Sequence, residues 1–288
     1  MINNWEKAPF INNSGGLLKQ DAHTNLPFSI GAITRQGFNH IDSGISNQDA
    51  IRLTVKDDLI IGILCDGCTS NHPELLDEFS QNQVGANLIA KMVLNLCYQN
   101  ILPRKNKMNL EVFAKWLTNE VSQRIKMILR VLKIDKNQHL NFICNNLLST
   151  ITGIIIREKE FFIFHYGDGI VKVNKKKYDL SKSSGNYIAT SQYMSNYDEL
   201  SFKIVTKGMT KTLTNVCIAS DGFSLDMLNT NRFNKLSTKK PTKNGFIDLI
   251  PEFHGEFLNQ YFDEKKSLES WPNDDASLIM IRRQKNNN

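Results

Sequence analysis

The alternation of apolar and polar residues predicts two strand hairpins in this chain. Residues 50–56 (AIRLTVK) alternate apolar and polar side chains, as expected of a strand with one buried face. Residues 59–64 form a continuous aliphatic run, which suits a central strand that is buried on both faces. A second hairpin is predicted from residues 150–156 and 161–166, which a polar turn at 157–160 joins.

Further strands are predicted at residues 27–35, 200–206, 216–219 and 276–281. The GDG tripeptide at 167–169 should interrupt the strand at 161–166, and residues 171–174 should then resume it. Residues 37–47 are polar and are expected to form a loop.

Helical spacing of apolar residues predicts two helices between the hairpins, at residues 74–99 and 109–134. The apolar positions of the first are Leu75, Phe79, Val84, Leu88, Met92 and Leu96. Those of the second are Leu110, Phe113, Leu117, Val121, Ile125, Ile128 and Val131. The two helices should cover one face of a sheet, and a weaker pattern predicts another helix at 246–262.

The order of these elements indicates an α+β fold with largely antiparallel sheets, because strand hairpins come first, helices follow and more strands end the chain. No internal repeat or linker divides the sequence. We therefore expect an N-terminal extension at 1–26, a single domain at 27–283 and a disordered tail at 284–288.

Composition is that of an ordinary globular protein. Of 288 residues, 41% are hydrophobic and 22% are charged, which excludes a wholly disordered chain, a collagen and a coiled coil. No apolar run approaches the roughly 18 residues of a membrane helix. The N-terminus lacks the basic start and the apolar stretch of a signal peptide. These observations predict a cytoplasmic protein that contacts no membrane.

Charge argues against a nucleic acid partner, and cysteine content argues against disulfide bonds. The formal net charge of +6 is scattered along the chain and forms no basic stripe with interleaved aromatic residues, so no nucleic acid partner is expected. The five cysteines are odd in number and lie mostly in apolar context, which indicates reduced core thiols rather than disulfides.

Five short segments place an aspartate directly beside an apolar strand. They are NQDA (47–50), LCDGC (64–68), YGDG (166–169), ASDGF (219–223) and NDDAS (273–277). A carboxylate at a buried strand end costs several kcal/mol unless it is paired or bound to a cation. No Arg or Lys is adjacent to Asp66, Asp168 or Asp221. If these strand ends converge, they need a hard divalent cation such as Mg²⁺ or Mn²⁺.

Simpler interpretations exist for each segment taken alone. A single Asp-Gly is usually a turn, and the two aspartates before residue 276 could be a solvated turn. Cys65 and Cys68 form a CxxC that in other contexts is redox-active or half of a zinc site, but the chain has no second CxxC. The recurrence of aspartate at apolar strand ends is what favours a metal site.

The order and the residues of these motifs resemble the protein phosphatase 2C family of metal-dependent serine/threonine phosphatases, in its bacterial-type branch. The resemblance runs from about residue 27 to residue 283. The resemblance implies that Asp66 bridges two metals and that Gly67 offers a carbonyl to the second. It also implies that Asp221 and Asp274 bind the first metal and that Asp168 helps to bind a third, looser one.

The chain departs from the usual Arg-x-x-Asn-Glu-Asp segment of that family. Gln48 replaces the glutamate and Gly44 stands where the phosphate-contacting arginine would be, while Asp49 remains. Gln48 is neutral, so Asp49 should compensate as a ligand of the second metal. The lost arginine removes a bidentate phosphate clamp, and Arg35 or His40 is expected to substitute for it.

The resemblance implies a central sandwich of two antiparallel β-sheets flanked by α-helices, in four αββα layers, with a flap at about 175–199. It implies an enzyme that hydrolyses phosphoserine and phosphothreonine in proteins, with two Mn²⁺ or Mg²⁺ ions activating a water molecule. Asp66, Asp221 and Asp274 would act through that water. The alternative is a catalytically weak or inactive module of the same fold that docks a phosphoprotein or a kinase, which Gln48 and Gly44 favour.

The partners implied by the resemblance are a phosphorylated protein and a cognate serine/threonine kinase system in signalling. The protein is expected to be a monomer.

Overall fold

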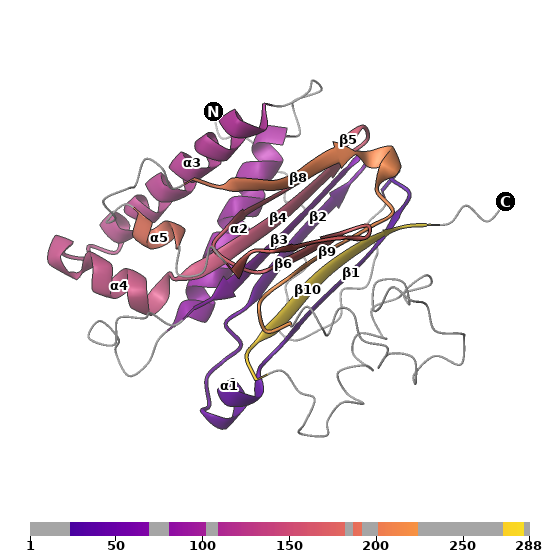
Figure 1. The fold of residues 1–288 in the computed structure, drawn as a ribbon. Coiled ribbons are helices and arrows are strands. Elements are labelled where there is room, and N and C mark those ends of the chain that lie inside the picture. Colours follow the sequence, from indigo (N-terminus) through magenta and orange to yellow (C-terminus); the bar gives the residue numbers. More distant parts are fainter. Residues whose placement is uncertain are drawn as a thin grey trace.

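The computed structural model describes most of the chain in six ranges, and Figure 1 shows how its elements are arranged. The described residues are 24–68, 81–101, 109–181, 187–191, 201–223 and 273–284. The structural statements that follow concern these residues.

Ten strands form two five-stranded sheets in which every pairing is antiparallel. The first sheet has the order β2 (Ala50–Lys56), β3 (Leu59–Gly67), β4 (Ser149–Arg157), β5 (Glu160–Tyr166) and β8 (Lys203–Met209). The second has the order β1 (Phe28–Arg35), β10 (Ala276–Arg283), β9 (Asn215–Ala219), β6 (Ile170–Val173) and β7 (Lys176–Asp179). The antiparallel α+β class expected from the sequence is confirmed.

Strand β3 explains why the sheets stack, since it is buried on both faces as its continuous apolar run predicts. Ile61 and Ile63 belong to the core beneath the helices. Ile60 and Leu64, which alternate with them, belong to the core between the two sheets. The period of two along one strand thus divides its side chains between two hydrophobic cores.

The helices follow the chain as α1 (Phe38–Asp42), α2 (Asn82–Ile101), α3 (Leu110–Val131), α4 (His139–Asn146) and α5 (Ile188–Ser191). Single 3₁₀ turns cover Lys136–Gln138 and Thr210–Thr212. Helices α2 to α5 lie on the side of the first sheet that faces away from the second sheet, and α1 lies apart from them (Figure 1). On α3, the ring of Phe113 packs edge-on against Phe162 and Phe164 of β5.

The buried face of α2 agrees only in part with the predicted one, since Met92 and Leu96 are buried as expected. Val84 and Leu88 were expected in the core but are 55% and 37% exposed, whereas Ile89 and Val93 are fully buried. The helix is apolar around much of its circumference, so the spacing of its apolar residues does not determine which face is buried. The small buried residues of its other face, including Ala86, let it lie close to the sheet.

The path of the chain after β5 also corrects a prediction. Residues 171–174 were expected to resume the strand at 161–166, but β6 pairs with β9 and β7 in the other sheet. Gly167 and Gly169 have φ values of 91° and 128°, a backbone region that other residues rarely adopt. The GDG tripeptide is therefore the crossover that carries the chain from one sheet to the other.

Other predicted boundaries are changed or lie outside the described residues. The loop at 37–47 contains α1, and the flap at about 175–199 begins with β7, which is part of the second sheet. Several predicted segments lie outside the described residues: 74–80 of the first predicted helix, 182–186 and 192–199 of the flap, the helix at 246–262, most of the extension at 1–26 and the tail after residue 284. The fourth layer, on the outer face of the second sheet, and the domain limits therefore stay predictions.

Within the described part of the chain, no helix combines the length and apolar character needed to cross a membrane.

Candidate metal centre

Strand register brings the predicted aspartates to one end of the sandwich. Ala50 of β2 pairs with Cys65 of β3, so Asp49 and Asp66 emerge side by side from neighbouring strands. Ala219 of β9 is the register partner of both Ile170 in β6 and Leu278 in β10. The segments that carry the other three predicted aspartates, 168, 221 and 274, therefore gather at the same end.

Asp66 lies at the centre of this group. Burial raises the pKa of its carboxyl group well above the ordinary value, and the charges of Asp49, Asp221 and Asp274 raise it further. The side chains of Asp66 and Asp221 lie close enough for their two carboxyl groups to share a proton. These carboxyl groups repel one another when all of them are ionised.

Asp49 is 5% exposed, and its two carboxylate oxygens differ in their hydrogen bonding. Its Oδ2 accepts a hydrogen bond from Ser220 Oγ at 2.9 Å, and Ser220 Oγ in turn accepts one from the backbone N–H of Ser277. Its Oδ1 is inaccessible to water and accepts no hydrogen bond of acceptable geometry from the described residues. Burial, with the nearby charge of Asp275, raises the pKa of Asp49 to about 7.

Asp221 and Asp168 lie toward the open side of the group. Asp221 is exposed as a whole residue, but its carboxyl group is partly withdrawn from water, and this burial raises its pKa. The charges of Asp168 and Asp274 raise it further. The charges of the neighbouring predicted aspartates thus act on the carboxyl groups of Asp66 and Asp221.

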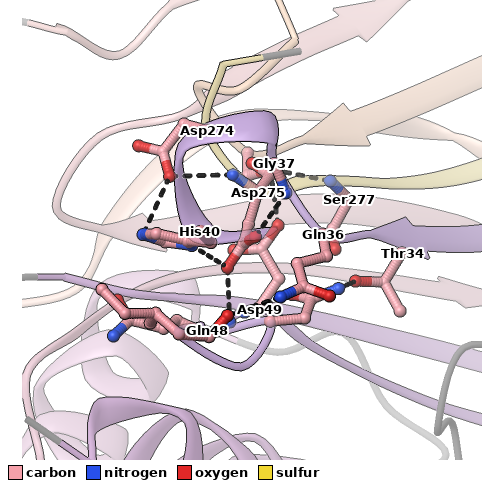
Figure 2. Close-up of polar contacts among 12 residues, drawn as sticks. Thr34, Gln36, Gly37, His40, Gln48, Asp49, Asp274, Asp275 and Ser277 are labelled. Atoms are coloured by element: carbon pink, nitrogen blue, oxygen red, sulfur yellow. Dashed lines mark hydrogen bonds and ion pairs between the residues drawn. The ribbon is translucent and has the colours of Figure 1, made fainter. Parts of the chain in front are cut away.

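Sequence reasoning missed the part played by Asp275, which is 2% exposed and ties the first loop to the last strand. Its carboxylate accepts hydrogen bonds from the backbone N–H groups of Gly37, at 2.7 Å, and of Gln48. Its Oδ2 also lies 2.8 Å from Nδ1 of His40 (Figure 2). The Asp-Asp pair before an apolar strand was visible in the sequence, but the three partners of the second aspartate were not.

His40 joins both aspartates of that pair. Its Nε2 lies 3.8 Å from Oδ1 of Asp274, and its side chain is 15% exposed. The hydrogen bond to Asp275 is the main cause that raises the pKa of His40 above its ordinary value, against the lowering effect of burial. This shift favours the protonated imidazole at the edge of the carboxylates.

The short helix α1 rests directly on the backbone of Asp274. A Cβ atom at Gly37 would lie 2.2 Å from the carbonyl carbon of Asp274, so only glycine allows this approach. The backbone N–H of Asn39 donates to the carbonyl of Asn273 at 3.0 Å. These contacts fix the position of His40 relative to the start of β10.

The remaining predicted residues lie at the same end of the molecule. Gly67 is buried at the end of β3 and donates its N–H to the carbonyl of Gln48 at 3.2 Å. Arg35 ends β1 opposite Ala276. Gly44 has φ of 67°, and no atom of the described residues lies within 4 Å of where its Cβ would be, so these residues leave the position of an arginine side chain open.

The chemistry of the donor set fits hard divalent cations. The predicted ligands are the carboxylates of Asp49, Asp66, Asp168, Asp221 and Asp274 with the carbonyl of Gly67, and all of them offer oxygen, as Mg²⁺ and Mn²⁺ prefer. The buried Oδ1 of Asp49 has a lone pair available for a cation. Cations would also relieve the repulsion that raises the pKa values of Asp49, Asp66 and Asp221.

The two cysteines beside Asp66 do not take part as thiolates. Burial raises the pKa of Cys65 and of Cys68 above the ordinary value, so both thiols are protonated. Cys68 Sγ lies 3.3 Å from the carbonyl oxygen of Asp66 and donates to it. This supports the interpretation of the CxxC as core and rim thiols.

Comparison with known proteins gives one family match. A family model described as "Protein phosphatase 2C" matches residues 36–269. A comparison with curated protein sequences finds no match.

Among solved structures, a bacterial serine phosphatase matches with a TM-score of 0.54 and 14% identity, over 91% of this chain and 100% of that one. The serine/threonine phosphatase PstP/Ppp of Mycobacterium tuberculosis matches with a TM-score of 0.53 and 12% identity, over 90% and 99%. The catalytic domain of the serine/threonine phosphatase PstP in complex with two manganese ions matches with a TM-score of 0.52 and 12% identity, over 90% and 99%. At these identities the structures establish the fold alone.

Proposed function

Because this chain belongs to the protein phosphatase 2C family, we propose that it is a metal-dependent enzyme that removes phosphate from phosphoserine and phosphothreonine in proteins. The observation that carries the proposal is the meeting of Asp49, Asp66, Asp168 and Asp221 with Asp274 at one end of the sandwich. A structural role alone would not require so many neighbouring carboxylates, because each raises the cost of ionising the others.

The proposed centre takes two Mn²⁺ or Mg²⁺ ions and a third that is held more loosely. Asp66 would bridge the first two, with Asp221 and Asp274 on one side and Asp49 with the Gly67 carbonyl on the other. Asp168 would hold the third. When bound, such ions lower the pKa of a coordinated water and balance the negative charge of a phosphoryl group.

The protein's own contribution is to hold these groups in place before substrate arrives. Ser220 keeps the Asp49 carboxylate oriented through its hydroxyl. Asp275 anchors the backbone of Gly37 and Gln48, so the loop that leads to Asp49 is fixed. Preorganisation of this kind avoids reorientation of the carboxylates during the reaction.

The chain lacks the family's arginine, so another side chain must contact the phosphate of the substrate. Arg35 is our candidate for the contact that the family's arginine makes, since it ends β1 opposite Ala276. His40 is the second candidate, and its role is considered below. A cognate kinase, a cytoplasmic location and a monomeric state also stay predictions.

The direct test is turnover of a phosphothreonine peptide with and without Mn²⁺. We expect activity only with the metal, and a loss of roughly a thousandfold or more in kcat/KM for Asp66→Ala and for Asp221→Ala, because each removes a metal ligand. Asp58→Ala, which changes an exposed aspartate in the β2–β3 turn, is the matched control and should keep full activity.

Two outcomes would count against the enzyme. Turnover that is unchanged in the Asp66 and Asp221 variants would remove the carboxylates from the chemistry. Binding of the phosphopeptide with no Mn²⁺-dependent turnover would instead favour the docking module, whose support is the neutral Gln48 and the open position at Gly44.

A further inference from the structure

His40 presents its two ring nitrogens to two different carboxylates. Nδ1 lies 2.8 Å from Oδ2 of Asp275, and Nε2 lies 3.8 Å from Oδ1 of Asp274. Figure 2 shows the imidazole between these groups, on the α1 side of the site. The two carboxylates differ in environment, because Asp275 is 2% exposed whereas the side chain of Asp274 is 64% exposed.

The buried carboxylate is held in place and therefore orients the ring. Asp275 accepts hydrogen bonds from the N–H groups of Gly37 and Gln48, in the loop that contains His40. With Nδ1 2.8 Å from this carboxylate, the other ring nitrogen, Nε2, is the one left near Asp274. Histidines that bind metals commonly donate their other ring N–H to a carboxylate in this way.

The distance between the two outer ligand atoms suits a shared ion. Nitrogen and oxygen ligands lie about 2.1 Å from a first-row divalent metal, so two ligands of one ion lie no more than about 4.2 Å apart. The 3.8 Å between His40 Nε2 and Asp274 Oδ1 is within this limit. Ligand atoms of His40, Asp274 and Asp275 all lie within 4.8 Å of one another.

We infer that His40 Nε2 is a ligand, beside Asp274, of one ion of the metal centre, and that Asp275 is the positioning residue that orients it. The inference rests on the proposed function for the presence of that centre. An imidazole ligand shifts preference toward Mn²⁺, Fe²⁺ or Zn²⁺ and away from Mg²⁺, which favours all-oxygen sites. The metal centre of this chain would thus prefer transition metals to Mg²⁺.

Pulsed electron paramagnetic resonance of the Mn²⁺-loaded full chain is the direct test, because a coordinated imidazole nitrogen couples magnetically to the ion. We expect nitrogen coupling in the wild type and its loss in His40→Asn. Asparagine keeps a donor close to the position of Nδ1 and can still contact Asp275, but it has no group at Nε2. His139→Asn, on α4 and outside the site, is the control and should keep the coupling.

Calorimetric titration gives the second readout. His40→Asn should weaken Mn²⁺ binding by about 10- to 100-fold while Mg²⁺ binding changes much less, and Asp275→Asn should weaken Mn²⁺ binding in the same direction by releasing the ring. A circular dichroism spectrum that matches the wild type establishes that each variant is folded.

The results separate this inference from the proposed function. Mn²⁺-dependent turnover without nitrogen coupling, or coupling that persists in His40→Asn, would overturn the inference and leave the enzyme in place. If His40→Asn raises KM but leaves metal affinity unchanged, the imidazole contacts phosphate and is not a ligand. Failure of the wild type to bind Mn²⁺ would overturn both.

Discussion

At the scale of single residues, the chemistry depends on carboxylates that are costly to ionise together. Asp49 and Asp66 are the clearest cases, because burial is the largest cause of the raised pKa of each. Their positions could be predicted from the sequence, since an aspartate beside a long apolar strand has few structural explanations. The pairing of His40 with Asp275 could not, because its partners lie more than 200 residues apart in the chain.

The raised pKa of Asp49 predicts how stability depends on pH. The group holds its proton up to about pH 7 in the folded chain but only to its ordinary value of 3.8 when unfolded. The folded state therefore binds more protons between these values, and stability of the metal-free protein falls as pH rises through this window. His40, whose pKa is also raised, acts in the same direction.

Thermal unfolding with a chelator should give a lower Tm at about pH 7 than at about pH 5. Added Mn²⁺ should raise Tm more at the higher pH, because the metal needs ionised carboxylates. Asp49→Asn should flatten the metal-free slope. A Tm that rises with pH in the chelated wild type would contradict the assignment of a protonated, buried Asp49.

At the scale of elements, strands were predicted more reliably than helix faces or connections. The continuous run of β3 specifies its burial directly, since its side chains meet two cores in turn. The alternation in β2 predicted the strand correctly, but Ala50 and Thr54 on its expected exposed face are also buried. Helix α2 offered apolar residues on several faces, and the partner of β6 depended on a change of sheet that no local pattern records. The short helix α1 was missed because five residues carry little periodicity.

The contact between α1 and the start of β10 can be tested with Gly37→Ala. The added Cβ would meet the backbone of Asp274 rather than a side chain that could move aside, so α1 must shift. We expect a loss of about 1–3 kcal/mol in the free energy of unfolding and weaker Mn²⁺ binding, measured by chemical denaturation and calorimetry. Asp42→Ala, an exposed change on the same helix, should alter neither quantity. Wild-type stability in Gly37→Ala would show that this contact does not hold the loop.

At the scale of the whole molecule, the sandwich places residues from both ends of the chain in one site. Asp49 and Asp66 come from the first sheet, while Asp221 and Asp274 come from the second. The sequence predicts that such strand ends could converge, and the resemblance of its motifs to a known family supplied the two-sheet architecture. The antiparallel register of the two sheets is what turns separate strand ends into one cluster.

The most direct test of this account is a crystal structure of the protein soaked in Mn²⁺, with anomalous scattering recorded to locate the ions. The account predicts two strong peaks on either side of the Asp66 carboxylate, about 2.0–2.3 Å from its oxygens, with Asp221 and Asp274 ligating one of them. Peaks that lie away from Asp66, Asp221 and Asp274, or no peaks at a saturating Mn²⁺ concentration, would contradict it.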